Sequence, residues 1–482
     1  MNQRQAAFIA RLRQSGPEAL DAGTVVLLPS LSFSMAELAK ITGVVHYEER
    51  LLCMTLHLRH PRLHMVYITS MAVDPAIVDY YLGFLPDPAD PRHRLHMVAL
   101  DDPDVRPLSD KLLDRPDVLA RITALAGAGD DGYIMPFNVT GSEQALSEAL
   151  ALPLFGAPPE LAWLGSKTGS KRSARQAGVL VLQGREDLWD LTEISKAIEL
   201  IRDHAPHAEA VVIKLNDGFA GQGNAIVELE LPVRPLPETE TTFCGTGESW
   251  PSFEAKIAAG GAIVEELVRN EEMVSPSVQL RVIPGRPAEV LSTHDQILGG
   301  PQGQVYIGCR FPADPSYRLI IQENAAKVGQ ILADHGVIGT FGIDFLVAPG
   351  RRGNAVYLSE INLRMGGTTH PFWMAKLVAD GRYDPTTGEL IAATGPKRYV
   401  ASDNLLAPDL IGRTPGYLID AIERAGLGFD PATGTGVTLH LLGAVPEYGK
   451  FGVTCIADTL DDAETLYAAV LALIIQESVV AS

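Results

Sequence analysis

The sequence lacks most of the features that would assign it at once to a common class of protein. Its 482 residues include four isolated cysteines, Cys53, Cys244, Cys309 and Cys455, which favours free thiols in a reducing cytoplasm over a disulfide scaffold. No run of about 18 apolar residues is present, so no membrane-spanning helix is expected. Basic residues are also scarce, and the net charge of −20 argues against a nucleic-acid partner, which needs a basic face. A soluble, acidic, cytoplasmic protein is therefore expected.

Both ends of the chain carry apolar residues, and both predict helices of a folded protein. At the N-terminus, Arg11 and Arg13 interrupt the apolar residues of MNQRQAAFIARLRQSGPEAL, which indicates an amphipathic helix rather than a signal peptide. At the C-terminus, LYAAVLALIIQES (466–478) is too short to span a bilayer, and it predicts a buried helix.

The length of the chain predicts two or three domains, and shifts in composition divide it into residues 1–156, 157–384 and 385–482. The first part alternates apolar strand candidates with helical patterns, which is typical of a Rossmann-like α/β domain. Its strand candidates are residues 24–31, 63–70, 95–102 and 133–138. The last part holds two strand candidates followed by a helical pattern, and it predicts a small α+β cap.

One glycine motif in the first part resembles a dinucleotide-binding fingerprint. Gly127, Gly129 and Gly132 form GxGxxG, but the motif follows a predicted helix and precedes a predicted strand. The fingerprint must instead follow a strand and open a helix. We therefore interpret these glycines as a loop.

The stretch YLSEINLRMGG (357–367) combines chemistry rarely found together at the end of a strand. Glu360, Asn362 and Arg364 follow an apolar run at alternate positions, so their side chains share one face. Upstream, GTFGIDF places Asp344 on another strand, and a turn rich in Gly and Arg (350–353) predicts a hairpin between the two. Two carboxylates and an amide oxygen are ligands suited to Mg²⁺, which also accepts substrate phosphates. The alternative is a polar, solvated strand end.

A candidate phosphate-binding segment lies at 211–229, VVIKLNDGFAGQGNAIVEL. A strand ends in Lys214, a glycine-rich loop follows, and a second strand begins at Asn224. A lysine supplies a compact positive charge, and small residues let backbone N–H groups approach phosphate oxygens. Since strands flank the loop and no GxxxxGK[ST] occurs, it is not a Walker loop. An ordinary glycine-rich hairpin is the alternative.

Weaker signals come from four other segments. GAIVEELVRNEE (261–272) is a strand leading into a linker whose backbone can meet an adenine edge, although a charged turn explains it as well. Lys167 and Lys171 open an amphipathic helix and suit phosphate binding or a solvated surface equally. In STHDQIL, Asp295 or Gln296 is a candidate for the phosphate site, with the role of His294 left open. His57, His60 and His64 suggest a metal site, but Pro61 interrupts any helical face and favours surface histidines.

Five of these elements, in order, resemble the ATP-grasp superfamily of carboxylate–amine ligases. They are SKTGSKRSARQAGV, KLNDGFAGQGNAIVEL, EELV, GTFGIDF and SEINLRMGG, and they cover about residues 160–375. Within the superfamily, the whole chain is most similar to the pheganomycin-type peptide ligases of antibiotic biosynthesis. The resemblance implies a pre-ATP-grasp Rossmann-like domain (1–156), an ATP-grasp domain (157–384) and a C-terminal α+β cap (385–482).

The resemblance also implies roles for individual residues, with ATP and Mg²⁺ as cofactors. Lys167 and Lys214 would bind the phosphates. The loop residues that would close over them are Gly218, Gly221, Gln222, Gly223 and Asn224. The adenine-binding linker would be Glu265, Glu266, Leu267 and Val268, and Glu272, or alternatively Glu271, would bind the ribose. Asp344, Glu360 and Asn362 would ligate Mg²⁺.

The catalytic residues expected from the resemblance are Arg364 and Arg281. D-alanine–D-alanine ligases have an arginine two residues before the first metal carboxylate, whereas this chain has Gly342 at that position. The oxyanion-stabilising role would therefore fall on Arg364, with Arg281 as a second candidate.

The expected activity is that of an ATP-dependent peptide ligase. It would join a carboxylate, such as that of an unusual amino acid, to a peptide amine through an acyl phosphate, and would release ADP and phosphate. The alternatives are a small amino-acid ligase that makes dipeptides and a non-catalytic nucleotide-binding protein with an ATP-grasp fold. No nucleic-acid or membrane partner is expected, and a homodimer is left open.

Overall fold

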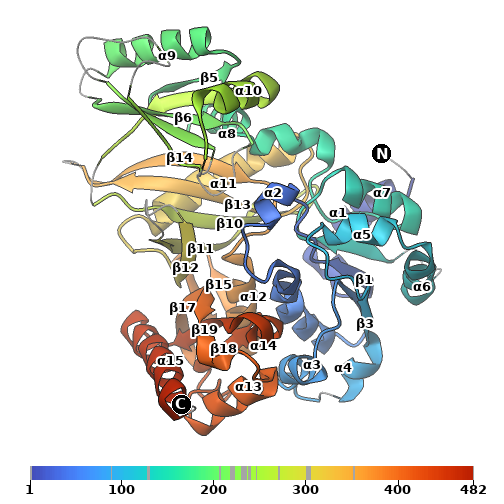
Figure 1. Cartoon of the computed structure of the whole chain (residues 1–482). Helices are drawn as coiled ribbons and strands as arrows, with labels where there is room; N and C mark the ends of the chain where they lie inside the picture. The colour runs from blue at the N-terminus through green and yellow to red at the C-terminus, as the bar shows by residue number, and fades with distance from the viewer. Residues whose placement is uncertain are drawn as a thin grey trace.

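The computed structural model describes residues 3–480. Its gaps are residues 88, 128–130, 206–207, 218–222, 230–235, 237–239, 246, 270–271, 300–304 and 351–352, and side chains are described as far as residue 475. The described residues build three β-sheets, of four, five and ten strands, with helices packed around them (Figure 1).

The four-stranded sheet forms the N-terminal α/β region. Its order is β3-β2-β1-β4, and each neighbouring pair is parallel. The strands are β1 (Gly23–Leu28), β2 (Leu63–Thr69), β3 (Leu95–Ala99) and β4 (Tyr133–Pro136). All four strand predictions are therefore confirmed, each within a few residues. The sheet order has β1 in the interior, as in other parallel α/β folds.

Helices surround this sheet. They are α1 (Gln3–Ser15), η1 (Gly16–Leu20), α2 (Met35–Leu38), η2 (Val44–Arg59), α3 (Pro75–Leu82), α4 (Ala89–Arg94), α5 (Leu108–Leu113), α6 (Pro116–Ala126) and α7 (Gly141–Leu150). The amphipathic N-terminal helix is confirmed, because α1 buries Phe8 and Leu12. Gly127 caps α6 with a positive φ of 75°, consistent with a loop rather than a nucleotide-binding turn; Gly129 lies outside the described residues.

The five-stranded sheet has the order β5-β9-β6-β7-β8, with antiparallel neighbours. Its strands are β5 (Gly184–Leu188), β6 (Ala210–Leu215), β7 (Asn224–Glu228), β8 (Thr241–Phe243) and β9 (Ala262–Glu266). The helices along this part of the chain are η3 (Pro159–Gly165), α8 (Lys167–Gln176), α9 (Leu191–His204) and α10 (Trp250–Gly260). A separate hydrophobic core, which includes Ile198, Ile213 and Phe253, packs α9 and α10 against this sheet.

The ten-stranded sheet is the centre of the molecule. Its order is β14-β13-β10-β11-β12-β17-β16-β15, and β19 pairs with both β17 and β18. The strands are β10 (Pro276–Val282), β11 (Glu289–Gly299), β12 (Val305–Phe311), β13 (Gly339–Ala348), β14 (Ala355–Asn362), β15 (Arg382–Asp384), β16 (Glu389–Ala392), β17 (Gly395–Leu406), β18 (Gly436–His440) and β19 (Lys450–Ala457). Its helices are α11 (Arg318–Asp334), α12 (Thr369–Val378), η4 (Pro408–Leu410), α13 (Pro415–Arg424), η5 (Leu442–Ala444), α14 (Val445–Tyr448) and α15 (Leu460–Val480).

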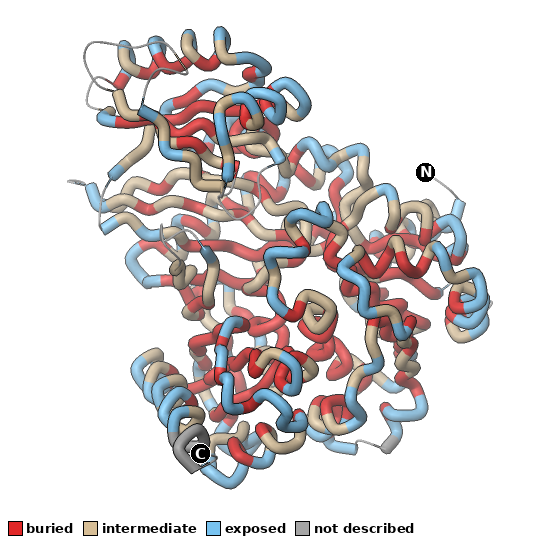
Figure 2. Tube along the Cα trace, in the orientation of Figure 1, coloured by how far each residue is buried: buried red, intermediate tan, exposed pale blue. Residues whose placement is uncertain are grey.

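The domain boundary expected between residues 384 and 385 falls in the hairpin between β15 and β16, both of which belong to the central sheet, and it stays a prediction. One sequence-based expectation needs correction. The C-terminal helix was expected to be buried, but among the described side chains of α15 only Ala463 and Val470 are buried, and Ile475 is 66% exposed. Figure 2 shows α15 on the outside of the molecule, beside the C-terminus. None of the described helices has both the length and the apolar character needed to cross a membrane.

Candidate active site

A cavity of about 1040 Å³ lies between the five-stranded sheet and the ten-stranded sheet. Its walls come from β6, β7 and β9 on one side and from β10 to β14 on the other. Residues of the N-terminal region, such as Phe33 and Arg50, and of the C-terminal strands, such as Asp403 and Lys450, close one end. All three parts of the chain therefore contribute to one site.

The acidic residues expected to bind Mg²⁺ lie together in this cavity. The hairpin of β13 and β14 places Asp344 directly opposite Glu360 and Gly342 opposite Asn362, as the sequence predicted. The Asn362 amide donates to Asp344 Oδ2 over 3.0 Å and to Glu360 Oε1 over 3.2 Å. Gln296 Nε2, from β11, donates to Asp344 Oδ1 over 2.9 Å.

The two carboxylates differ strongly in their electrostatic surroundings. Burial and the neighbouring Glu360 charge raise the pKa of Asp344 to about 7. Burial alone would raise the pKa of Glu360 as well, but the Lys167 ammonium, with Lys214 and Arg364, outweighs that effect and holds it at about 2. The cations of the chain therefore stabilise the charge of Glu360 much more than that of Asp344.

Helix α8 delivers Lys167 to this cluster. The Ser166 side chain caps the helix by accepting from the Gly169 N–H over 3.0 Å, so that Lys167 begins the first turn. The Lys167 ammonium contacts the Glu360 carboxylate. Ser170, one turn on, accepts from the Ile361 N–H of β14 over 2.9 Å and fixes the helix against the hairpin.

A second charged cluster joins Lys214 of β6 to Lys171 of α8. Glu265 of β9 is 1% exposed, and its carboxylate lies 2.5 Å from the Lys214 ammonium and 2.6 Å from that of Lys171. The two ammoniums outweigh the effect of burial and lower the pKa of Glu265 to about 2. Lys171 was expected to bind phosphate or to lie on the surface. It is instead 2% exposed and forms a buried ion pair with Glu265.

The linker after β9 lies in the wall of the cavity, as expected. The N–H groups of Glu266 and Leu267 donate to Gln183 O (2.8 Å) and Ala210 O (3.0 Å), while that of Val268 has no partner among the described residues. Asn224 lines the cavity, and Gly223 accepts from the Leu215 N–H over 2.9 Å. Glu272 is exposed and does not line the cavity. Gly218, Gly221, Gln222 and Glu271 lie outside the described residues.

The two arginines expected to act in catalysis lie in different places. Arg364 lines the cavity: its guanidinium donates to Asn362 Oδ1 over 3.0 Å and lies 5.3 Å from the Phe33 ring centroid. Burial lowers its pKa, although Glu360 and Asp344 oppose that shift. Arg281 is an ion-pair partner of Glu289 at 2.7 Å and lines a second cavity instead.

Comparison with known proteins assigns the chain to a family. It is 31% identical over 465 residues to L-propargylglycine–L-glutamate ligase of Streptantibioticus cattleyicolor, with 94% of each chain covered. The chain belongs to the ATP-grasp superfamily. It is an ATP-dependent ligase. The IQCH-like ATP-grasp family matches residues 239–385, and the PGM1 C-terminal domain family matches residues 417–470.

Solved structures agree with this ATP-grasp assignment at the level of the fold. The biotin carboxylase of Campylobacter jejuni, in complex with β,γ-ATP, has a TM-score of 0.55 and 15% identity, over 93% of this chain and 90% of that one. N5-carboxyaminoimidazole ribonucleotide synthetase, in complex with ADP, has a TM-score of 0.53 and 12% identity, over 95% and 98%. A more distant sequence relative is IQ motif-containing protein H of Danio rerio, 21% identical over 67% of this chain and 35% of its own.

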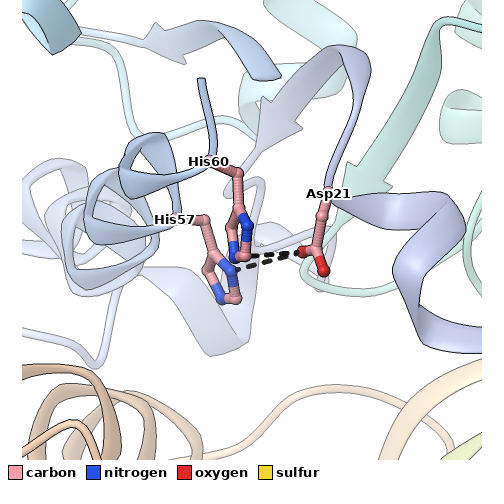
Figure 3. A group of neighbouring side chains, drawn as sticks. All are labelled: Asp21, His57 and His60. Carbon is pink, nitrogen blue, oxygen red and sulfur yellow. Dashed lines mark ion pairs between the residues drawn. The ribbon is translucent and has the colours of Figure 1, made fainter. Parts of the chain in front are cut away.

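The second cavity of this ATP-grasp protein shows where His57 and His60, expected to be surface histidines, lie. His57 and His60 do not lie apart on the surface; they face Asp21 at the edge of a cavity of about 340 Å³, with ring nitrogens 3.9 and 3.7 Å from its carboxylate (Figure 3). Burial lowers the pKa of His57 to about 3, so its ring is neutral at pH 7. Arg281 and Lys376 also line this cavity, which is separate from the ATP-grasp site.

The sequence left Asp295 and Gln296 as alternative candidates for the ATP-grasp site, and the structure separates them. Gln296 lines the cavity, whereas Asp295 bonds the Tyr317 hydroxyl over 2.8 Å, and His294 is fully buried against the Tyr399 hydroxyl. Alternation along β11 could have separated Gln296 from Asp295. No local pattern marked the other end of the cavity, which is formed by Arg50, Asp403 and Lys450.

Proposed function

We propose that this ligase activates a carboxylate as an acyl phosphate, transfers it to the amine of a peptide and releases ADP and phosphate. The observation that carries this proposal is the convergence of three groups in one cavity. These are the acidic hairpin of Asp344 and Glu360, the ammoniums of Lys167 and Lys214, and the guanidinium of Arg364. An acid needs a leaving group better than oxide before an amine can displace it, and phosphoryl transfer from ATP supplies one.

The acidic hairpin suits Mg²⁺. Asp344, Glu360 and the oxygen of Asn362 are hard donors of the kind that Mg²⁺ prefers, and two neighbouring carboxylates in a partly buried wall call for a cation. When bound, Mg²⁺ would neutralise charge on the phosphates during transfer. Gln296 and Asn362 hold the Asp344 carboxylate by two hydrogen bonds, which orients it toward the cavity.

The remaining residues act by binding and orienting. Lys167 and Lys214 would hold phosphate oxygens, positioned respectively by the α8 cap and by Glu265. The N–H of Val268 would meet the adenine edge, since the neighbouring N–H groups are already bonded. We retain Glu272, beside the linker, as the ribose-binding candidate, and the loop with Gly218, Gly221, Gln222 and Gly223 as the phosphate cover.

Arg364 is the group proposed to act on the reacting carboxylate. Its planar guanidinium offers paired N–H donors to a carboxylate or acyl phosphate. The amine nitrogen then attacks the acyl carbon, the carbon–oxygen bond to phosphate breaks, and phosphate leaves with the electron pair. Arg364 would stabilise the oxyanion formed between these events.

A second candidate is a ligase that joins two free amino acids. The 31% identical relative is named for two amino acids, L-propargylglycine and L-glutamate, and that name favours a dipeptide product. We place either reaction in the cytoplasm, where ATP is abundant. The described structure shows all four cysteines unpaired, as a reducing setting requires.

Product analysis tests the proposal directly. The protein is incubated with ATP and Mg²⁺ and a panel of amino acids and short peptides, and the products are identified by mass and nucleotide chromatography. ADP is expected only when an acid and an amine are both present, together with one amide product. Stoichiometric AMP would contradict the acyl-phosphate route, and ADP release without any amide would contradict ligation. Dipeptide products alone would select the second candidate.

A further inference from the structure

One end of the ATP-grasp cavity carries positive charge that neither ATP nor the metal site explains. Arg50, from η2, and Lys450, from β19, both line this end, and Arg364 faces it from β14's continuation. At the nucleotide end, Glu360 and Glu265 already face lysines of the chain, and Asp344 is assigned to the proposed metal. At this end, the acid that faces Arg50 and Lys450 is Asp403 of β17.

Arg50 is a buried cation with incomplete pairing. It is 9% exposed, and its ion pair with Asp403 Oδ2 is long, at 3.3 Å. Its Nε is buried and has no hydrogen-bond partner among the residues that the structure describes. The guanidinium lies 4.4 Å from the Tyr47 ring centroid and 5.5 Å from that of Phe137, both in the cavity wall. A buried charged donor without a partner is costly unless a ligand completes its bonds.

Lys450 lies beside Arg50, and both cations lie over the ring of Tyr47. Lys450 is 4% exposed, and its ammonium donates to the Tyr47 hydroxyl over 2.8 Å and to Thr42 O over 3.4 Å, both neutral acceptors. Burial lowers its pKa, Arg50 lowers it further, and Asp403 opposes the shift. Of these two buried cations only Arg50 forms an ion pair, with Asp403, and the Arg364 guanidinium is a third positive group lining the same cavity.

We propose that Arg50 and Lys450 bind a carboxylate of the acceptor that takes no part in the reaction, the α-carboxylate of an amino acid or the C-terminal carboxylate of a short peptide. This inference rests on the proposed function. The donor's carboxylate is consumed beside Arg364 and the acidic hairpin, whereas an amino-acid or peptide acceptor uses its amine and keeps its carboxylate. The acceptor then spans the cavity from the cationic end to the reacting centre.

The test compares acceptors with their amides. Three pairs are used: L-glutamate and its α-amide, L-alanine and L-alaninamide, and glycylglycine and its amide. Each is assayed for amide product and ADP with the donor acid found in the product screen. For the best acceptor pair, the wild type is expected to favour the free acid by about 10- to 100-fold in kcat/KM, the range typical of a charge-assisted hydrogen bond. Equal use of acid and amide by the wild type would overturn the proposal.

Variants separate recognition from structure. Arg50→Gln is expected to lose the preference through a higher KM for the acid, while Arg50→Lys keeps part of it. Lys40→Gln is the matched control, because Lys40 lines the same cavity but is paired with Glu37 and 42% exposed; it should keep the full preference.

Binding of a non-hydrolysable ATP analogue by calorimetry shows whether each variant is folded. If Arg50→Gln does not fold, Lys450→Gln is measured in its place. A parallel loss of rate for acid and amide would mean that Arg50 only clamps Asp403, and would overturn the proposal. If no acceptor yields ADP and product, the proposed ligation fails, and this subsite falls with it.

Discussion

Glu265 shows how much of the proposed nucleotide site depends on a single buried carboxylate. Its carboxylate is shared between the Lys171 and Lys214 ammoniums, deep between α8 and the five-stranded sheet. Without it, two buried positive charges would repel each other a few ångströms apart. Its role in the structure is thus to keep Lys214 charged and in place at the cavity wall.

Glu265→Gln is expected to destabilise the protein by about 3–5 kcal/mol at pH 7, the usual cost of removing one partner from a buried ion pair. Urea unfolding measures this. Glu228→Gln is the matched control on β7 of the same sheet, since its ion pair with Arg269 is partly exposed; it should cost less than about 1 kcal/mol. Similar losses for both would show that the buried triad contributes little.

The same residue predicts a pH dependence. Its folded pKa of about 2 lies below its ordinary value of 4.5, so its contribution to stability is complete above pH 4.5 and is lost as the pH falls toward 2. The difference in unfolding free energy between the wild type and Glu265→Gln should therefore shrink between pH 5 and pH 3. A constant difference across that window would contradict the low pKa.

Arg364→Lys tests the oxyanion donor. Lysine keeps the charge but not the paired donors, so ligation is expected to slow by about 10²–10³, while ATP binding changes little. Product mass gives the rate, and calorimetry on the same preparation gives the nucleotide affinity. Equal loss of both would make Arg364 a nucleotide-binding residue.

At the scale of elements, the hairpin of β13 and β14 is the unit that creates the acidic site. Its register sets Asp344 against Glu360, and a β-bulge follows between Asp344 and Phe345. Bulges turn side chains away from regular alternation and are common beside active sites. The buried residues Phe345 and Leu358 anchor the hairpin in the central core, independently of the acids.

Glu360→Gln is therefore expected to keep the fold and to abolish Mg²⁺-dependent turnover. The apolar face of β14 is unchanged, whereas the site loses one charge and one ligand. Thermal unfolding checks the first point, and the rate as a function of Mg²⁺ concentration checks the second. A near-normal rate at ordinary Mg²⁺ would remove the hairpin from the metal site.

The elements of the site were largely predictable, because each combined a local pattern with its own chemistry. The strand preceding Lys214, the helix opening at Lys167 and the acidic hairpin all lie as the sequence indicated. Arg281 shows the limit. Gln279 of β10 and Gly342 of β13 line the main cavity. Two residues away on the same faces of these strands, Arg281 and Thr340 line the second cavity instead. Alternation along a strand predicts which side chains share a face. It does not predict where another segment of the chain packs on that face and separates one cavity from the next.

Contacts between distant segments could not be predicted for the same reason. HYEER, in η2, shows no chemical motif, yet Glu49 accepts from the Gly443 N–H over 2.9 Å, and Arg50 pairs with Asp403. Nothing local distinguishes such buried charges from a solvated turn. Only the packing of η2 on β17 and η5 gives them partners.

At the scale of the whole molecule, the N-terminal region and the C-terminal strands form one body. A single hydrophobic core holds Phe8 and Leu12 of α1 together with Phe451 and Val453 of β19. The five-stranded sheet has a core of its own. Residues 385–482 are therefore not an independent cap in terms of packing.

A chain truncated after residue 384 is expected to be insoluble or unfolded. It would lose β16 to β19 from the central sheet and would expose the apolar residues of η2 and α12 that pack on them. Solubility and circular dichroism test this, with a chain truncated after residue 475 as the control. A soluble, folded chain of residues 1–384 would contradict this expectation and would support the domain boundary that the sequence predicted.

This shared core also constrains the order of events during synthesis. The ribosome releases α1 and β1 first, whereas β19, which belongs to the same hydrophobic core, leaves the exit tunnel near the end of translation. The nascent chain must therefore keep its first domain incomplete through almost the whole of translation, which makes it a natural client for chaperones that bind emerging chains. Ribosome-arrested chains that end before residue 450 should remain open to protease within the first 85 residues, and complete chains should not.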